Sequence, residues 1–247
     1  MLSFGRVTLT IGTRALLAPT TYAVEKGGRL SIVGTSGAGK STILRLALGL
    51  ASPTAGEVFV LGEPLTRESS ARLRLRIGYV VQEGGLFPHL KAGDGAAIVA
   101  EQLGWPVARR KERLLELSHL VGLAPDLFDR YPFQLSGGQR QRVGLIRALM
   151  LDPELLLFDE PFAALDPVSA AKMEDDLLGV IDSLGKTLLM VTHDIGQAAR
   201  IGHDIAVIHE GRLLQLGTYA ALAREPAHPF VTELLRAQRP PPEAGAA

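Results

Sequence analysis

The chain has 247 residues with 26 Lys or Arg and 26 Asp or Glu, so its formal net charge is zero and no broad basic field favours nucleic acid or anionic lipid as a partner. The absence of Cys excludes disulfides and Cys-based metal sites. No apolar run reaches the ~18 residues of a membrane-spanning helix, and the sequence does not open with a signal-peptide pattern.

The predicted elements alternate between strands and helices. RVTLTIG at 6–12 and GEVFVLG at 56–62 alternate apolar and polar residues, which favours antiparallel strands. RLSIVG at 29–34 is a short apolar strand, and 40–50 follows it as a helix. Three further apolar runs are typical of parallel strands covered on both faces, and they lie at 77–82, 154–160 and 187–194.

Between Gln82 and Gln134 the pattern becomes helical. Residues 107–121 predict a charged helix on which Leu114, Leu117 and Val121 share one face. We therefore expect a mostly helical insert within an α/β core. The Pro- and Ala-rich end of the sequence, 237–247, predicts a disordered tail.

A glycine-rich loop, GTSGAGKST, lies between the strand at 29–34 and the helix after it, and it matches G-x-x-x-x-G-K-[ST]. Its glycines let the backbone N–H groups point at one anion, and the helix N-terminus adds its positive end. A turn that merely connects strand to helix is the alternative, which this context disfavours. The loop predicts a nucleotide phosphate site formed by Gly34, Thr35, Ser36, Gly37, Ala38, Gly39, Lys40, Ser41 and Thr42.

Two carboxylates end the apolar run at 154–160. Asp159 is placed to hold Mg²⁺ together with the Ser41 hydroxyl, and Glu160 is placed to polarise an attacking water as a general base. An isolated Asp-Glu pair commonly just ends a strand or caps the next element. Beside an intact phosphate loop, the catalytic interpretation is favoured.

Five motifs follow one another along the chain: GTSGAGKS, VVQEGG, LSGGQ, LLLFDEP with AALD, and VTHD. In this order they resemble the ATP-binding subunit of an ABC transporter, from about Phe4 to Leu235. The resemblance implies an α/β fold: a P-loop NTPase core of ABC type with an N-terminal antiparallel β subdomain and an inserted helical subdomain. The implied parts are a nucleotide-binding core at 1–82, an insert at 83–135 that contacts a permease, and the continued core at 136–236.

The resemblance also implies a head-to-tail homodimer in which the signature of one subunit closes over the ATP of the other. Ser136, Gly137, Gly138 and Gln139 form this signature, and Gly permits close backbone approach to an anion at a helix N-terminus. A Ser N-cap followed by flexible Gly is the alternative. Asp166 is expected at the dimer interface, or else as an N-cap before Pro167.

ATP and Mg²⁺ are the implied cofactors. The implied catalytic residues are Glu160, His193, Gln82 and Lys40, and the implied Mg²⁺ ligands are Ser41, Gln82 and Asp159. A lone Gln at a strand end is usually an ordinary solvated residue, and a lone His after a strand is more often structural.

One position departs from the family pattern. Members usually carry an aromatic residue that stacks on adenine, and its spacing places it near Ile11, which is aliphatic. The nearest aromatic residues, Phe4 and Tyr22, do not lie at the expected place. Loose discrimination between bases is therefore predicted.

The insert carries a finer resemblance. IGYVVQEGGLFPHL and DRYPFQLSGGQRQRV are similar to importers of quaternary amines such as glycine betaine, choline or carnitine. This implies a permease and a substrate-binding protein as partners, no nucleic acid, and a peripheral location on the cytoplasmic face of the inner or plasma membrane. The sequence also allows two alternatives: the ATPase of a lipid-trafficking or export system, and a soluble ABC ATPase without a membrane partner.

Overall fold

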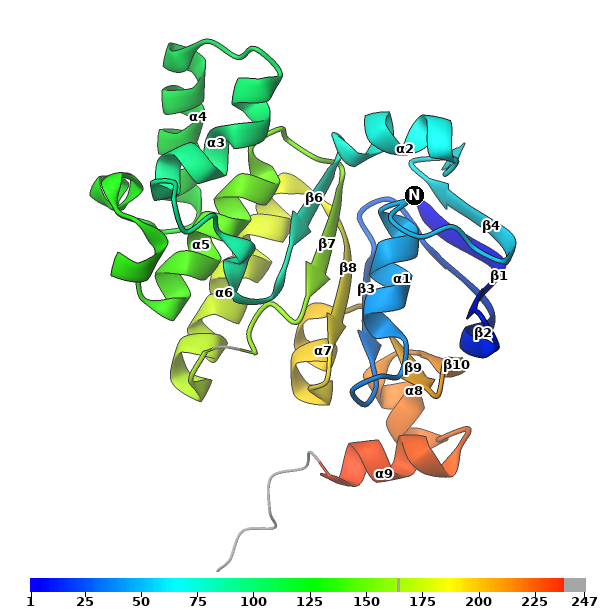
Figure 1. Ribbon diagram of the computed structural model, residues 1–247. Helices are drawn as coiled ribbons and strands as arrows, with labels where there is room; N and C mark the ends of the chain where they lie inside the picture. Colours follow the sequence, from blue (N-terminus) through cyan, green and yellow to red (C-terminus); the bar gives the residue numbers. More distant parts are fainter. Residues whose placement is uncertain (164, 238–247) are drawn as a thin grey trace, which may run out of the picture.

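The computed structural model describes residues 1–163 and 165–237, and the predicted tail beyond 237 lies outside this range. Two sheets form the framework, and helices pack around them (Figure 1). The predicted α/β architecture with an antiparallel N-terminal part is confirmed by their topology.

The smaller sheet is antiparallel and has the order β2-β1-β4-β5. β1 pairs antiparallel with both β2 and β4, as the alternating pattern predicts. The strands of this sheet are β1 Leu2–Ile11, β2 Arg14–Val24, β4 Ala55–Val60 and β5 Glu63–Pro64.

The larger sheet has the order β10-β9-β3-β8-β7-β6, in which β10 alone among the described strands of this sheet runs antiparallel to its neighbour. Its strands are β3 Arg29–Val33, β6 Ile77–Val80, β7 Leu155–Asp159, β8 Thr187–Thr192, β9 Asp204–His209 and β10 Arg212–Gly217. Because the carboxyl ends of parallel strands meet at one edge, the loops that follow β3, β7 and β8 are brought together there.

Both faces of this sheet are buried, as the apolar runs predict. Alternate residues of a strand point to opposite faces, and in β7 Leu156 and Phe158 join one hydrophobic cluster while Leu155 and Leu157 join another. The first cluster contains residues of α3, α5 and α6, and the second contains residues of α1 and the antiparallel sheet. Figure 1 shows these layers on the two sides of the sheet.

The insert is helical, and its longest helix packs by the predicted face. Leu117 of α4 and Val121, the residue that follows this helix, are buried in one hydrophobic cluster, and Leu114 packs against that cluster. The helices are α1 Lys40–Ala47, α2 Arg67–Arg74, α3 Ala92–Gln102, α4 Val107–Leu120, α5 Gly137–Leu149, α6 Pro167–Leu184, α7 Ile195–Ile201, α8 Tyr219–Arg224 and α9 Pro229–Ala237, with 3₁₀ turns η1 Gln82–Gly85, η2 Pro125–Asp129 and η3 Pro132–Gln134.

The strand expected at 77–82 is shorter than predicted, because β6 ends at Val80 and Gln82 begins η1. Gly84 and Gly85 have φ of 76° and 55°, a conformation that bends the chain and that Gly adopts without strain. The turn lies directly on α5: a Cβ on Gly84 would be 2.6 Å from the carbonyl oxygen of Arg140, and one on Gly144 would be 2.9 Å from the Gly84 Cα.

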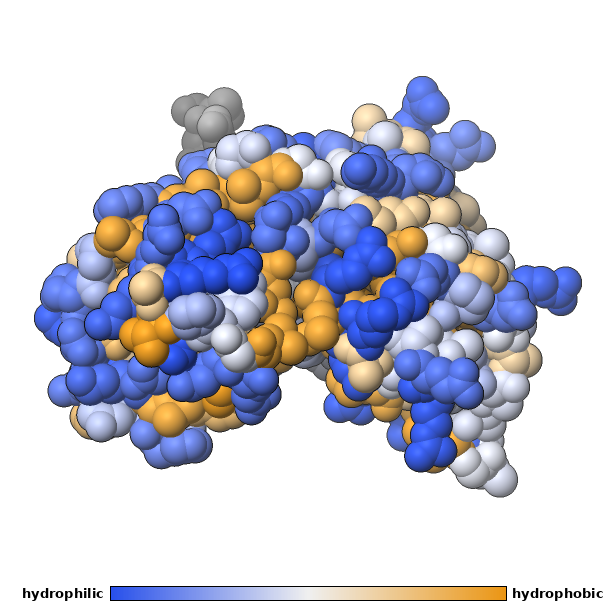
Figure 2. Space-filling model, turned by 90° about the horizontal axis from the view of Figure 1, so that it is seen from above, coloured by the Kyte–Doolittle hydropathy of each residue, from blue (hydrophilic) through white to orange (hydrophobic). Residues whose placement is uncertain are grey.

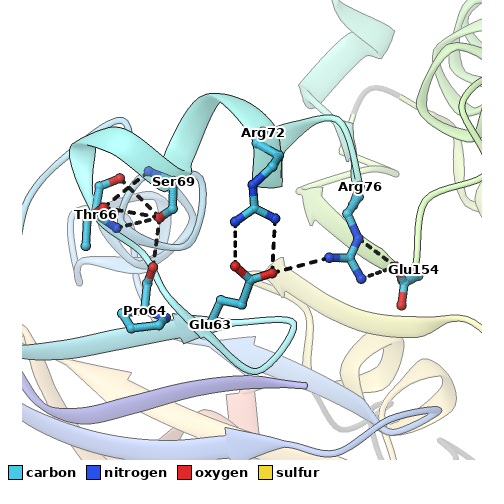
Figure 3. Close-up of polar contacts among 7 residues, drawn as sticks. All are labelled: Glu63, Pro64, Thr66, Ser69, Arg72, Arg76 and Glu154. Carbon is cyan, nitrogen blue, oxygen red and sulfur yellow. Dashed lines mark hydrogen bonds and ion pairs between the residues drawn. The ribbon is translucent and has the colours of Figure 1, made fainter.

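A polar network ties the antiparallel sheet to the larger one. Arg76 lies between Glu63 of β5 and Glu154, which precedes β7, with nitrogen-to-oxygen distances of 3.6 Å and 2.6 Å (Figure 3). Arg72 of α2 donates to Glu63 from both terminal nitrogens, and this hydrogen bonding lowers the pKa of the Glu63 carboxyl.

The upper face of the molecule is mostly polar, and apolar side chains gather in the hollow between its two lobes (Figure 2). Within residues 1–163 and 165–237, no helix has both the length and the apolar character required to cross a bilayer.

Candidate nucleotide-binding site

The loop between β3 and α1 has the conformation that its glycines were expected to provide. A Cβ on Gly34 would lie 2.1 Å from the carbonyl oxygen of Ile208, so only Gly fits there. Gly37 and Gly39 have φ of 78° and 103°, and Gly39 is the residue that precedes the first turn of α1. This left-handed backbone leaves the loop curled in front of a helix N-terminus, a geometry that favours anions.

Lys40 is buried, and its ammonium group reaches back over the loop. Its Nζ donates to the carbonyl oxygens of Gly34 at 2.8 Å and Thr35 at 3.1 Å, and it lies 3.5 Å from Glu160 Oε1. A full positive charge is therefore held beside the anion-binding backbone.

Asp159, at the end of β7, faces the loop from the neighbouring part of the sheet. Its Oδ1 accepts from Ser41 Oγ at 3.4 Å, and its Oδ2 accepts from the Tyr79 hydroxyl at 3.2 Å. Burial raises the pKa of the Asp159 carboxyl, and the nearby Glu160 charge raises it further. Burial also raises the pKa of Tyr79 to about 12, so this hydroxyl remains a donor at neutral pH.

Glu160 lies at the centre of the predicted catalytic group. Its Oε2 is 2.7 Å from His193 Nδ1, and its carboxylate also contacts Lys40. The residue has a φ of 46°, a strained backbone conformation for any residue other than Gly. Its N–H donates to the carbonyl oxygen of Val191 in β8 at 2.9 Å. The turn after β7 thus aims a carboxylate, which is 22% exposed, at the space above the phosphate loop.

One cavity lies against the phosphate loop, Lys40 and Glu160. It is lined by Arg14, Ala15, Leu16, Ser36, Gly37, Gly39, Lys40, Ser41, Thr42, Glu160, Glu210 and Gly211. The sequence identified every phosphate-loop residue in this lining, together with Glu160. It did not identify the wall made by the start of β2 and by the turn between β9 and β10, because no local motif marks these segments.

Ser41 and Asp159 fit a magnesium ion. Across the described residues, no cluster of three or more His, Cys, Asp or Glu side chains could hold a metal by itself. Mg²⁺ does not need one, since it keeps several waters and takes one or two carboxylates together with substrate phosphates. The hydroxyl and carboxylate oxygens 3.4 Å apart suit that mode of binding.

The signature does not take part in this cavity within one chain. Ser136 is the N-cap of α5, with its Oγ accepting from Gln139 N at 3.2 Å and its N–H donating to Gln139 Oε1 at 2.8 Å. A Cβ on Gly138 would meet nothing within 4 Å, so packing inside this chain does not require Gly there. Gly137, Gly138 and Gln139 thus form a partly exposed first turn of α5.

Asp159 and His193 contact the lining residues Ser41 and Glu160 without lining the cavity themselves, whereas Gln82 and Asp166 lie outside the lining with no such contact among the described residues. Gln82 is exposed at the first position of η1. Asp166 is the N-cap of α6 and accepts from Val168 N at 3.1 Å and Ser169 N at 3.0 Å, and hydrogen bonding, led by Ser169, lowers its pKa. The N-cap alternative describes Asp166 within the single chain, and its interface role stays a prediction.

The position expected for an adenine-stacking aromatic is aliphatic and open. Ile11 is 64% exposed at the end of β1. Phe4 and Tyr22 are buried and stack on each other with ring centroids 4.7 Å apart, so neither ring is free to receive a base.

A family model described as ABC transporter matches residues 17–163. The chain belongs to the ABC transporter family.

Several relatives in this family are named for transport of glycine betaine, carnitine or choline. The glycine betaine/carnitine/choline transport ATP-binding protein OpuCA of Bacillus subtilis is 39% identical over 87% of this chain, which spans 57% of that protein's length. The glycine betaine uptake system ATP-binding protein YehX of Escherichia coli is 38% identical over 94% of this chain and 76% of its own.

A solved structure shares the fold. The ATP-binding cassette MJ0796, determined as a dimer in a post-hydrolysis state bound to ADP and Pi, has a TM-score of 0.78 and 31% identity, covering 88% of this chain and 98% of that one.

Proposed function

We propose that this chain is the ATP-hydrolysing subunit that energises an ABC importer of glycine betaine, choline or a related osmoprotectant. The observation that carries the ATPase part is the placement of Glu160, 2.7 Å from His193 and 3.5 Å from the phosphate-loop Lys40. A base and a phosphate-binding cation line one cavity, and an orienting partner contacts the base, which is the arrangement that phosphoanhydride hydrolysis by water requires.

Each side chain has a distinct role in this proposal. The loop N–H groups and Lys40 bind the outer phosphates. Ser41 and Asp159 hold Mg²⁺, which when bound neutralises phosphate charge. Glu160 accepts a proton from the attacking water, and His193 holds the Glu160 carboxylate in place and contacts the terminal phosphate.

The site is shared between two copies of the chain. Within one chain, the signature residues at the start of α5 are not among those that line the cavity. The MJ0796 cassette was determined as a dimer, which supports a homodimer here, and a head-to-tail arrangement of the two copies would bring these two half-sites together. ATP closes this dimer, and hydrolysis reopens it.

The face beside η1 is proposed to receive the permease. Phe87 is 38% exposed, whereas the adjacent Leu86 packs against the core of the insert, so Leu86 anchors the segment and Phe87 projects from it. An exposed ring that follows two Gly residues suits a surface for a partner helix. The names of the OpuCA and YehX relatives support quaternary amines as the cargo.

The test is to purify the chain with its permease and binding protein and to measure uptake of glycine betaine and choline into vesicles. Phe87→Asp should abolish uptake while ATP binding persists. Leu50→Asp, at another exposed apolar residue 62% accessible to solvent and outside the insert, is the matched control and should leave uptake intact. Association with a lipid-binding partner, or with no membrane protein, would overturn the proposed transport role and favour the lipid-trafficking or soluble alternatives.

A further inference from the structure

The nucleotide cavity has two ends, which lie on opposite sides of β3. Because the sheet order is β10-β9-β3-β8-β7-β6, Glu160 after β7 lies on one side of the phosphate loop, and the turn at Glu210 and Gly211 lies on the other. The start of β2 belongs to the second side: Ala18 N donates to Gly211 O at 2.8 Å, and a Cβ on Gly211 would be 2.6 Å from the carbonyl oxygen of Leu16.

This geometry orients a bound nucleotide, given the proposed function on which the present inference rests. The phosphate that is cleaved must lie beside Glu160, and the remaining phosphates follow the loop. The base therefore lies at the other end, against Arg14, Ala15 and Leu16.

The second end offers one planar group of suitable chemistry. None of the described residues that line the cavity is aromatic. Arg14 is exposed, and within the described part of the chain its guanidinium has no hydrogen-bond or ion-pair partner. Ile11 is paired with Arg14 across the hairpin and leaves an open aliphatic side chain next to it.

We propose that Arg14 is the base-contacting residue of this site and that its guanidinium stacks on the face of the nucleobase. A guanidinium is planar, delocalised and weakly hydrated, which suits it to stacking on π systems. Every base presents such a face, so this contact binds purines without distinguishing among them. Arg14 thereby sets both the affinity for the base and the loose selectivity.

A purely electrostatic role for Arg14 toward the phosphates is the competing explanation. Two observations disfavour it. The Glu210 carboxylate lines the same end of the cavity and repels a polyphosphate there, and the groups that bind phosphate, Lys40 and the loop backbone, lie nearer to Glu160.

Calorimetric titration with ATP, GTP and inorganic tripolyphosphate separates the two roles. The titrations use the full chain with Mg²⁺ in a Glu160→Gln background, which keeps the nucleotide uncleaved. Arg14→Ala should lower the affinity for ATP and for GTP by about tenfold, the scale of one stacking contact. It should leave the affinity for tripolyphosphate unchanged. Arg14→Lys retains the positive charge but lacks the planar guanidinium, and it should lower the affinity for both nucleotides to a similar extent.

Two results would overturn the inference: an equal loss of tripolyphosphate affinity in Arg14→Ala, or unchanged ATP affinity in both Arg14 variants. Arg67→Ala removes the same charge from the exposed start of α2, away from the cavity, and should change none of the three affinities. Lys40→Ala in the same Glu160→Gln background tests the proposed function itself. If this variant binds ATP as tightly as the Glu160→Gln chain does, the loop is not the phosphate site, and the assignment of Arg14 is then also wrong.

Discussion

Replacing Glu160 by Gln should separate nucleotide binding from hydrolysis. The substitution keeps the size of the side chain and removes its charge and its proton-accepting oxygen. Lys40 loses a partner 3.5 Å away but retains its bonds to the carbonyl oxygens of Gly34 at 2.8 Å and Thr35 at 3.1 Å, so the phosphate grip remains. Loss of the Glu160 charge also removes one cause of the raised pKa of Asp159, which favours the carboxylate that Mg²⁺ requires.

The size of the effect follows from the role assigned to Glu160. General base catalysis contributes about a hundredfold to ten-thousandfold, and each tenfold corresponds to ~1.4 kcal/mol of activation free energy. We therefore expect hydrolysis at saturating Mg-ATP to fall by at least about a hundredfold, while the Kd for ATP stays near that of the wild-type chain.

Phosphate release measures the rate, and size-exclusion chromatography with ATP measures dimer formation, which should increase because the closed state is no longer consumed. Glu154→Gln is the matched control: it makes the same change at the opposite end of β7, where Glu154 pairs with Arg76 at 2.6 Å outside the cavity, and it should hydrolyse ATP normally. A Glu160→Gln chain that hydrolyses ATP at nearly the wild-type rate would refute the assignment.

The shared site predicts that Lys40→Ala and Ser136→Arg chains are each inactive alone and that their mixture recovers phosphate release from the one intact site; wild-type activity of Ser136→Arg alone would exclude the signature from catalysis. Ile11→Tyr should lower the Kd for ATP by about tenfold, since base stacking on an aromatic ring is worth ~1–3 kcal/mol; an unchanged Kd in calorimetry would contradict this. Tyr79→Phe removes the donor 3.2 Å from Asp159, which raises that carboxyl's pKa further. The Mg²⁺ concentration for half-maximal hydrolysis should then rise by about threefold to tenfold, and the acid limb of the rate profile should move to higher pH; an unaltered Mg²⁺ requirement would show that Tyr79 does not position Asp159.

Much of the geometry of the candidate half-site could be predicted because it depends on local motifs and one general rule. Lys40 follows a glycine-rich loop, and Glu160 and His193 end apolar runs. Since parallel strands share a carboxyl edge, residues at these positions meet without any knowledge of the detailed packing.

Other contacts depend on register and packing that the sequence does not encode locally. The bond between Tyr79 and Asp159 requires β6 and β7 to pair in the observed register, with Val80 opposite Phe158. Arg14 reaches the cavity only because the β1–β2 hairpin packs beside the phosphate loop. The signature does not line the cavity of its own chain. In the proposed dimer it faces the cavity of the second molecule, which a single sequence cannot show.

The contact between η1 and α5 has a mechanical consequence. Gly84 and Gly144 bring the two backbones together with no side chain between them, and Arg147 fastens them further by donating to the carbonyl oxygens of Gly84 at 3.1 Å and Gly85 at 2.5 Å. Such a joint is stiff, because no rotamer change is available to absorb a displacement and close-packed interiors transmit strain. A displacement of the turn beside the proposed permease face is therefore expected to move α5 as a rigid body, and with it the signature at the start of that helix.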